Sequence, residues 1–410
     1  MSHIAVIGAG QAGSALAAKL RALGYEGRVS LIGAEPVPPY QRPPLSKKYM
    51  SGEMELERLF LRPESFYAEQ GIDLLTEAHV SSLDPERMTL RLSGREEIAA
   101  DKIALTTGAD PIHLPQEMGG GLPGVYTMRT LADADAMAHE FAAGRRVLIV
   151  GGGYVGLEAA AVAATRGLEV TLVEMAPRIL ARVAAEETAQ WIKALHVSHG
   201  VDIREGCGLD GLSPVQGGHL AAMLSDGSRI EVDFVITGIG VRPATGLAEA
   251  AGLEIDNGIK VDAFGRTSHA GIFAAGDCAS FPWKGQRIRL ESVPNAIDQA
   301  EATAATMLGQ EAPYVARPWF WSDQYDVKMQ IAGLNSGYDR VVTRPGDKPG
   351  SQSHWYFRGA ALLAVDAMNE PRAYMTGKRL IEAGQSPDPG ALADPAVPLK
   401  SLPLAATRAA

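Results

Sequence analysis

Three glycines near the start of the chain have the spacing needed to hold the phosphates of a dinucleotide. Gly8, Gly10 and Gly13 form a GxGxxG motif between an apolar run at residues 4–7 and helix-forming residues at 14–23. The first glycine permits a tight turn, the second lets the backbone approach a pyrophosphate, and the third lets helix and strand pack closely. Unpaired N–H groups at the start of the helix would attract the phosphate charge. Taken alone, the stretch could also be a glycine-rich turn of an ordinary α/β protein.

The same pattern occurs a second time further along the chain. Residues 146–150 form an apolar run, and Gly151, Gly153 and Gly156 follow it before another helix-forming stretch. Glu174 lies 23 residues past Gly151, close to the ~20 expected for an acidic residue that holds a ribose 2′-hydroxyl. Because a carboxylate repels a 2′-phosphate, this site favours NADH over NADPH. Two copies of the pattern favour two dinucleotide-binding domains.

Three polar residues are further candidates for binding a ligand. Glu35 follows the second apolar run and could accept hydrogen bonds from an adenosine ribose, although Ala34 could occupy that position instead. Lys47 ends a proline-stiffened loop at residues 38–47, and base rates favour a solvated surface lysine there unless this loop lies over a cofactor. Asp277 ends the stretch GIFAAGD, where it could bind a ribityl hydroxyl or cap the next helix.

The elements that must position these residues predict an α/β fold in three parts. Apolar strands that end in Thr-Gly at residues 107–108 and 237–238 repeat one unit, which suggests that the second glycine motif lies in a domain inserted into the first. We therefore predict two Rossmann-like dinucleotide-binding domains and an α+β C-terminal domain. Their predicted limits are 1–110 with 243–316, then 111–242, and then 317–410.

Composition excludes several classes of protein. The 410 residues are 46% hydrophobic and 21% charged, with a net charge of −10, which argues against general binding to nucleic acid. No apolar run reaches the ~18 residues that span a bilayer, and the first predicted strand leaves no room for a signal peptide. Two distant cysteines, Cys207 and Cys278, offer no local redox pair, which fits the cytoplasm. We expect no membrane contact and no metal site.

Together these motifs resemble the flavoproteins that carry two dinucleotide-binding domains in a glutathione-reductase-like fold. Within that group the chain is similar to the NADH-dependent ferredoxin reductases of bacterial monooxygenase systems, of the putidaredoxin reductase and rhodocoxin reductase type. The resemblance covers essentially the whole chain and is carried by the stretches IAVIGAGQAG, PYQRPPLSK, VLIVGGGYVGLE, GIFAAGDC, ESVPNAIDQA and PWFWSDQY. It implies FAD at the first glycine motif and NADH at the second, with the isoalloxazine between them.

The resemblance also implies a role for individual residues. The residues implied to bind FAD are Gly8, Gly10, Ala12, Gly13, Glu35, Lys47, Val80, Arg129, Asp277 and Val293. Those implied to bind NADH are Gly151, Gly153, Tyr154, Gly156, Glu158, Glu174 and, near the nicotinamide, Glu291.

Three residues carry the implied catalytic roles. Lys47 would favour the negative charge that a hydride brings to the flavin, and Glu158 would be the carboxylate partner that a buried ammonium needs. Trp321 resembles the aromatic residue that packs on the acceptor side, although it could be ordinary core. Disulfide reductases of the wider group carry cysteines in the loop after the second strand, whereas PPYQRPPLSKKYM has none. Electrons would then leave the flavin directly.

The implied acceptor is a [2Fe–2S] ferredoxin that serves a haem-thiolate monooxygenase. Because such ferredoxins are acidic and this chain is acidic too, docking needs a local basic patch, for which Lys378, Arg379 and Lys400 are candidates. One alternative is a peroxide, disulfide or rubredoxin reductase that uses the same flavin. Another is a flavin-dependent redox sensor resembling apoptosis-inducing factor, which would form a long-lived charge-transfer complex with NADH.

Overall fold

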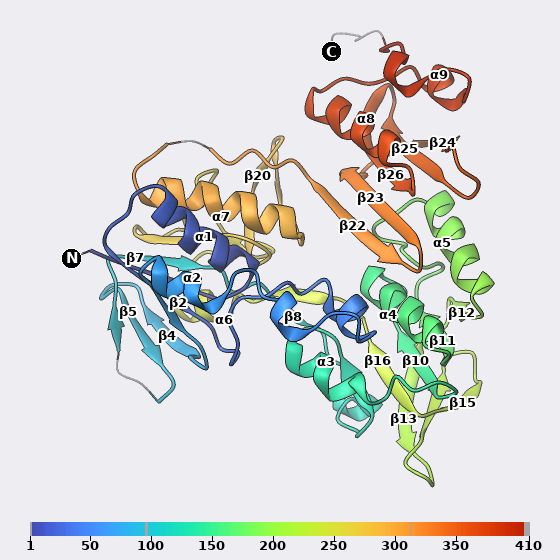
Figure 1. The fold of residues 1–410 in the computed structure, drawn as a ribbon, viewed down its shortest axis with the longest axis horizontal. Helices are drawn as coiled ribbons and strands as arrows, with labels where there is room; N and C mark the ends of the chain where they lie inside the picture. Colours follow the sequence, from blue (N-terminus) through green and yellow to red (C-terminus); the bar gives the residue numbers. More distant parts are fainter. Residues whose placement is uncertain (1, 95–96, 312, 406–410) are drawn as a thin grey trace. The chain divides into compact units, whose positions relative to one another are not determined.

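The computed structural model describes residues 2–94, 97–311 and 313–405, and the chain divides into two compact units (Figure 1). The first unit consists of Met1–Arg42, Met54–Asp110 and Val241–Pro318. The second unit consists of Pro43–Glu53, Pro111–Gly240 and Trp319–Ala410. Each unit is therefore assembled from three separate stretches of sequence.

The first unit is built on a five-stranded parallel sheet. Its strands, in spatial order, are β19 (Ile272–Ala274), β7 (Lys102–Leu105), β1 (His3–Ile7), β2 (Arg28–Ile32) and β3 (Ile72–Leu75). Helices α1 (Gln11–Ala22) and α7 (Val293–Met307) lie side by side on one face (Figure 1), and their apolar residues share a core with the strands. All five residues of β1 are buried, as expected for a central strand covered on both faces.

Smaller elements cover the other face of this sheet and share a second core with it. They form two three-stranded sheets, β4-β5-β6 and β18-β20-β21, together with the short helix at Gly246–Ala250. The strands of the first of these sheets are β4 (Val80–Asp84), β5 (Thr89–Leu92) and β6 (Ile98–Ala99), and those of the second are β18 (Ile259–Lys260), β20 (Ala279–Trp283) and β21 (Gln286–Ile288). The other elements of the unit are η2 (Leu56–Arg58), α2 (Glu64–Glu69) and α6 (Gly246–Ala250). Strands β8 (Ala109–Pro111) and β17 (Val241–Pro243) lie where the chain leaves and re-enters the unit.

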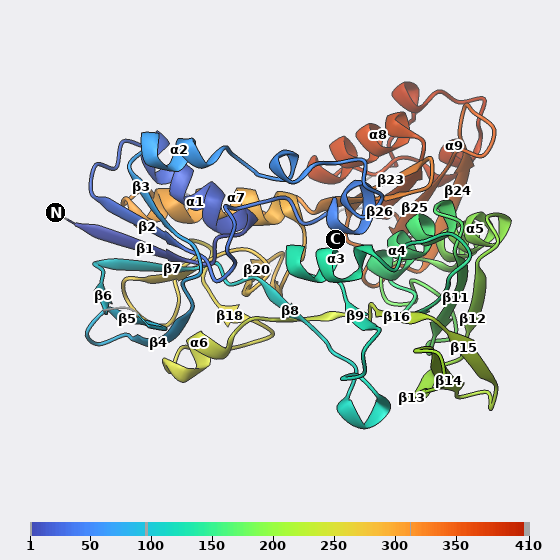
Figure 2. The same ribbon diagram turned by 60° about the horizontal axis from the view of Figure 1, so that its bottom comes forward.

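The second unit contains a parallel sheet of similar order, but its last strand comes before the other four in the sequence, whereas the equivalent strand of the first sheet comes after them. Its strands are β12 (Asp202–Glu205), β11 (Glu169–Glu174), β10 (Arg146–Val150), β16 (Phe234–Thr237) and β9 (Val125–Thr127). The β10–α4–β11 unit therefore repeats β1–α1–β2, and β16 takes the place of β7. Figure 2 shows α4 (Tyr154–Thr165) and α5 (Glu186–Ser198) with β11 and β12. The other elements here are η1 (Leu45–Tyr49), η3 (Gln116–Met118), α3 (Leu131–Ala138), β13 (Leu209–Pro214), β14 (Leu220–Leu224) and β15 (Arg229–Val232).

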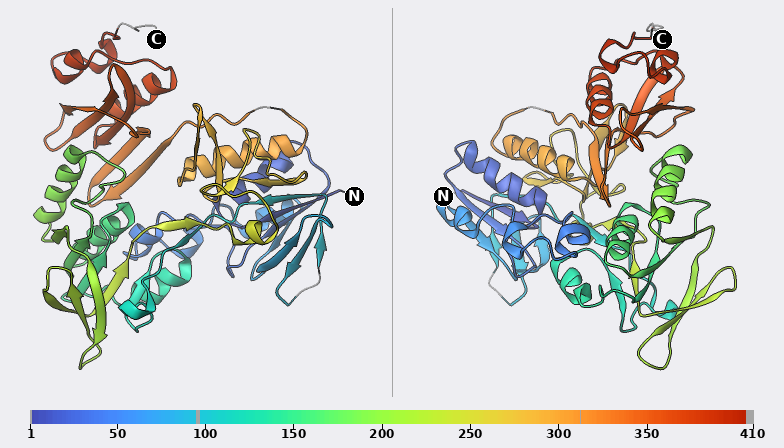
Figure 3. Two further views of the ribbon diagram at one scale, coloured as in Figure 1. Left: turned by 180° about the vertical axis from the view of Figure 1, so that it is seen from behind. Right: turned by 45° about the vertical axis from the view of Figure 1, so that its right-hand side comes forward.

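An antiparallel sheet forms the C-terminal part of the second unit (Figure 3). Its strands, in spatial order, are β22 (Trp319–Gln324), β23 (Val327–Gly333), β26 (Ala361–Met368), β25 (Gln352–Arg358) and β24 (Arg340–Pro345). Helix α8 (Pro371–Glu382) packs its buried residues into the core of this sheet. Two short helices, α9 (Pro389–Ala393) and η4 (Leu399–Ser401), follow it.

Candidate functional site

The outer glycines of both motifs are required by close backbone contacts. Gly8 and Gly151 have φ of 110° and 108°, and a Cβ there would lie 2.2 Å and 2.5 Å from the carbonyl oxygens of Thr106 and Gly238. The third glycines are equally constrained, because a Cβ on Gly13 or Gly156 would lie 2.0 Å or 2.1 Å from the carbonyl oxygen of the first glycine. Any side chain at these four positions would displace the turn.

The middle glycines instead face open space. A Cβ on Gly10 or Gly153 would have no neighbour within 4 Å. These two residues are the N-caps of α1 and α4, and neither helix has a capping side chain within the described part of the chain. Backbone N–H groups at the positive end of each helix are thus directed toward room for a ligand, which fits a pyrophosphate at both loops.

Two acidic residues lie beside these loops, in different surroundings. Glu174, the last residue of β11, accepts hydrogen bonds from the backbone N–H of Gly152 and of Ala176, both at 2.7 Å. The carboxylate of Glu35 is bound by the Tyr40 hydroxyl and the Arg42 guanidinium, both at 2.6 Å. Glu174 therefore lies against the second glycine loop, whereas Glu35 is held by the loop that follows it.

The other residues implied to bind FAD in the first unit lie on several elements. Ala12 lies in the first turn of α1, where its methyl group would be 3.0 Å from a Cβ on Gly276. Val80 is buried at the start of β4, and Val293 begins α7. Asp277 follows β19. Glu291, implied to bind NADH, is exposed and pairs with Arg289.

A buried ion pair forms behind the second glycine loop. Lys47 Nζ, from η1, lies 3.0 Å from Oε1 of Glu158 on α4, and the two side chains are only 14% and 8% exposed. Ser322 Oγ donates to the same carboxylate oxygen at 2.7 Å, and Ser46 Oγ donates to Oε2 at 3.0 Å. Asp323 Oδ2 lies 3.7 Å from Lys47 Nζ. A fixed ammonium is thereby held among hydrogen-bonded partners within one unit.

Burial and hydrogen bonding shift the pKa of Glu158 in opposite directions. Burial raises the pKa of Glu158, whereas the Lys47 charge and the donors Ser322 and Ser46 lower it. Burial also raises the pKa of the Tyr154 hydroxyl well above its usual range, and that hydroxyl has no hydrogen-bond partner among the described residues. The ammonium and the two hydroxyl donors therefore offset part of the cost of burying the Glu158 carboxylate.

The aromatic and basic residues implied for this region lie on the same unit. Tyr154, at the start of α4, packs edge-to-face on Phe320, with ring centroids 5.1 Å apart. Trp321 is half-buried on β22 next to Trp319, with ring centroids 5.8 Å apart. The backbone N–H of Arg129, just before α3, donates to Asp133 at 3.1 Å.

Three members of the Lys47 cluster were not singled out from the sequence. Ser46 is the neighbour of Lys47, and Ser322 and Asp323 lie in the PWFWSDQY stretch that carried the resemblance. Their positions inside motifs specific to the resembled group could have marked them as candidate site residues. Nothing local, however, distinguishes these serines from surface serines, because their partner Glu158 lies more than a hundred residues from each of them.

The cysteines and the candidate docking charges lie outside this cluster. Cys207 and Cys278 are both free and buried, and burial raises the pKa of the Cys278 thiol. Lys378 pairs with Glu382 on α8, whereas Arg379 and Lys400 are exposed. Neither cysteine forms a disulfide in the structure.

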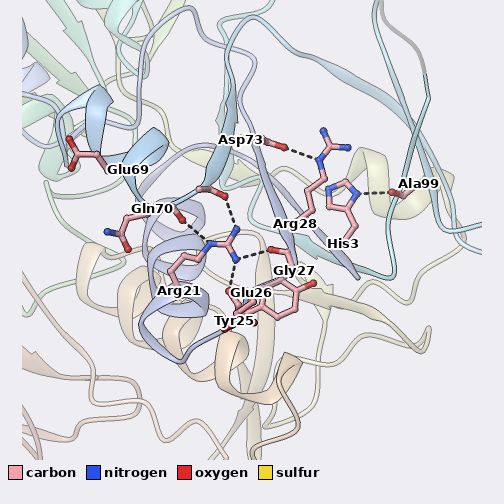
Figure 4. A pocket seen from close by; sticks show the side chains of 11 residues that line it. His3, Arg21, Tyr25, Glu26, Gly27, Arg28, Glu69, Gln70, Asp73 and Ala99 are labelled. Atoms are coloured by element: carbon pink, nitrogen blue, oxygen red, sulfur yellow. Dashed lines mark hydrogen bonds and ion pairs between the residues drawn. The ribbon is translucent and has the colours of Figure 1, made fainter. Parts of the chain in front are cut away.

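An open pocket in the first unit is a poor candidate for chemistry. It has a volume of about 920 Å³ and is lined by His3 and Arg28, the first residues of β1 and β2 (Figure 4). Gly8 follows the other end of β1. Arg28 pairs with Asp73, and the Arg21 guanidinium donates to backbone carbonyls (Figure 4). Both arginines that line the pocket are therefore already bound to protein groups.

Comparison with known proteins identifies the family. Residues 2–300 match the family described as pyridine nucleotide-disulphide oxidoreductase, and residues 319–403 match the one described as reductase C-terminal. The chain belongs to the pyridine nucleotide-disulphide oxidoreductase family. The predicted resemblance is thus confirmed.

Individual relatives match over nearly their full length. A ferredoxin–NAD(P)(+) reductase of Sphingomonas sp is 41% identical over 97% of each chain, and putidaredoxin reductase of Pseudomonas putida is 39% identical over 98% of this chain and 97% of its own. The crystal structure of a covalent putidaredoxin reductase–putidaredoxin complex matches with a TM-score of 0.93 at 39% identity, covering 97% of each chain. The predicted fold class is confirmed by this match. Within the described residues, no helix has both the length and the apolar character that crossing a bilayer requires.

Proposed function

We propose that this chain is an NADH-dependent ferredoxin reductase that uses FAD and serves an oxygenase system. It is an oxidoreductase, its cofactors are FAD and NADH, and its partner is a ferredoxin. The finer proposal is that the ferredoxin carries a [2Fe–2S] cluster and that the terminal enzyme is a haem-thiolate monooxygenase. The observation that carries the proposal is the buried Lys47–Glu158 pair behind the second glycine loop, combined with cysteines that are buried and free.

The glycine loops supply the proposed cofactor contacts. The FAD pyrophosphate is assigned to Gly8, Gly10, Ala12 and Gly13, and we propose that the rest of that site includes Glu35, Lys47, Val80, Arg129, Asp277 and Val293. For NADH we propose Gly151, Gly153, Tyr154, Gly156, Glu158, Glu174 and Glu291. FAD held by these residues would supply an acceptor for the hydride of NADH and a donor of single electrons.

The protein's own part in the reaction is positioning and charge. Glu174, held by Gly152 and Ala176, offers a carboxylate to a ribose hydroxyl and repels a 2′-phosphate. Glu158 positions the Lys47 ammonium by pairing with it, and that positive charge would favour electrons arriving on the flavin. Trp321 provides an aromatic surface on β22 for the acceptor side.

Domain limits, location and docking complete the proposal. We propose a FAD domain at 1–110 with 243–316, a NAD domain at 111–242 and a C-terminal domain at 317–410. The cytoplasm is the proposed location, because both cysteines are free. The ferredoxin is proposed to dock near Lys378, Arg379 and Lys400. Since Lys378 is already paired, charge reversal at Arg379 and Lys400 should raise the KM for ferredoxin most at low salt.

An anaerobic experiment tests the function. The FAD-loaded protein is mixed with NADH or NADPH, and then with a [2Fe–2S] ferredoxin, a small disulfide or peroxide. We expect NADH to bleach the flavin faster than NADPH does, and the ferredoxin to restore the oxidised spectrum while the disulfide and peroxide do not. Faster reoxidation by the disulfide or peroxide, or a long-lived charge-transfer band that ferredoxin does not discharge, would overturn the proposal.

A further inference from the structure

A line of buried hydrogen bonds connects helix α5 to the carboxylate of Glu158. Ser322 Oγ lies 2.7 Å from Glu158 Oε1, and Gln324 Nε2 lies 3.1 Å from Ser322 Oγ. Gln324 Oε1 lies 2.7 Å from His196 Nε2, and His196 Nδ1 lies 3.1 Å from the Tyr325 hydroxyl. Four hydrogen bonds in series therefore end on the carboxylate that pairs with Lys47.

The chemistry of the groups fixes the direction of every bond in this line. An ionised Glu158 only accepts, so the single Ser322 proton points to it, and Ser322 must in turn accept from the amide nitrogen of Gln324. The Gln324 carbonyl oxygen then faces His196 and requires an N–H at Nε2. Neutral imidazole has one donor and one acceptor, so Nδ1 accepts from Tyr325.

All three inner members are sealed from water, which makes the arrangement costly to disturb. Ser322, Gln324 and His196 are 0%, 2% and 0% exposed. Burial lowers the pKa of His196 to about 4, so its ring is neutral at neutral pH. Hydrogen bonds that all point the same way polarise one another in such an environment.

Other ionisable groups also face this line. Lys47 from η1 lies against Glu158, and Asp323 from β22 lies near Lys47. Tyr154, on α4 itself, also feels this carboxylate, because burial and then nearby charged groups, Glu158 among them, raise the pKa of its hydroxyl. At the other end, the exposed His199 ring stacks on Tyr325 with ring centroids 3.7 Å apart.

We propose that Tyr325, His196, Gln324 and Ser322 form a directed hydrogen-bond relay that holds Glu158 ionised and in one orientation. Gln324 and His196 are thus positioning residues, which act through Glu158 on the Lys47 ammonium. This inference rests on the proposed function for its effect on hydride transfer, but the relay itself is a property of the protein alone. No proton needs to travel along it, because its role is electrostatic.

The first test is spectroscopic and needs no turnover. The FAD-loaded protein is labelled with ¹⁵N-histidine, and the His196 signals are assigned by their loss in His196→Asn. We expect a neutral ring with the proton on Nε2 at pH 7. A proton on Nδ1, or a charged ring, would overturn the relay whether or not the protein proves to be a reductase.

The second test measures the pH profile of flavin reduction by NADH in stopped flow. Gln324→Met keeps the length of the side chain but removes both polar ends, and Ser322→Ala removes the last donor. We expect the acid limb of the profile to move up by about half a pH unit in Gln324→Met and about one unit in Ser322→Ala, because a carboxylate that loses a donor is easier to protonate. The Kd for NADH should stay within about twofold.

The matched control is Gln190→Met, an exposed glutamine on α5 whose amide contacts Glu186. Its pH profile should match that of the wild type. A purely structural role for the relay would instead lower the Tm of Gln324→Met and Ser322→Ala and leave the acid limb in place. That result would refute the proposal, as would an equal displacement of the limb in the control.

Discussion

Replacing Lys47 by methionine should affect stability and hydride transfer by separable mechanisms. The methionine fills similar space but leaves the Glu158 carboxylate buried without its ammonium. At 3.0 Å and an effective dielectric constant of ~20, the attraction between the two charges is about 5–6 kcal/mol. Because desolvation offsets part of this, removing one partner should cost roughly 3–5 kcal/mol of unfolding free energy.

The loss of unfolding free energy in Lys47→Met should increase as pH rises. Without Lys47, the pKa of Glu158 in the folded protein rises still further above its unfolded value, because burial already raises it. The folded state then binds a proton that the unfolded state has released, so stability falls by up to ~1.4 kcal/mol per unit as pH rises above ~4.5 toward the folded pKa. We therefore expect the unfolding free energy of Lys47→Met to be close to that of the wild type at pH 5 and much lower than it at pH 8.

A double variant separates charge burial from catalysis. Lys47→Met/Glu158→Gln removes both charges and should recover most of the stability, as measured by urea unfolding of the FAD-loaded protein at pH 5 and pH 8. Its rate of flavin reduction at saturating NADH should remain about 100-fold or more below wild type, since the ammonium is still missing. A wild-type reduction rate in either variant would remove Lys47 from hydride transfer. A double variant as unstable as the single one would refute the explanation by charge burial.

Three further predictions concern other sites. Glu174→Arg should shift the ratio of kcat/KM for NADH and NADPH about tenfold or more toward NADPH, and an unchanged ratio would contradict a ribose contact. Cys207→Ser and Cys278→Ser should each reduce ferredoxin at the wild-type rate. Loss of turnover in a folded, FAD-loaded variant would instead support a mechanism that uses a thiol. Burial raises the pKa of Asp366 to about 6, which costs the folded wild type stability as pH rises from ~4 through 6. Asp366→Asn should gain up to about 3 kcal/mol over wild type between pH 4 and 7 in urea titrations, and a gain independent of pH would contradict this.

The parts of the fold that depend on local sequence were predictable. The glycine motifs determine a strand, a turn and a helix within about thirty residues, so β1–α1–β2 and β10–α4–β11 could be anticipated from spacing alone. Membership of the family and the α/β class followed from several specific stretches. The segment after Gly384 is rich in proline and alanine and carries no clear helical pattern, yet Asp388 caps α9 by accepting a hydrogen bond from the Ala391 N–H at 2.8 Å.

The surroundings of the buried ion pair were not predictable from spacing. Lys47 and Glu158 were named from the resemblance, and the structure places them in contact. The sequence does not predict a role for Ser322, Gln324 or His196. Each is an ordinary polar residue, and only tertiary folding brings its partner near. In a strand such as β22 alternate residues share a face, which is why Ser322 and Gln324 point the same way, but the sequence does not say what they face.

The stretch Pro43–Glu53 packs with the second unit although it lies between two segments of the first. During synthesis, Lys47 leaves the ribosome long before Ser322 does, and at 5–20 residues per second the delay is roughly tens of seconds. For that time Lys47 lacks the serine that donates to its carboxylate partner Glu158. A contiguous fragment that begins at Pro111 would never contain this lysine, so attempts to express the nucleotide and C-terminal regions alone should yield a product that precipitates or depends on acidic buffer.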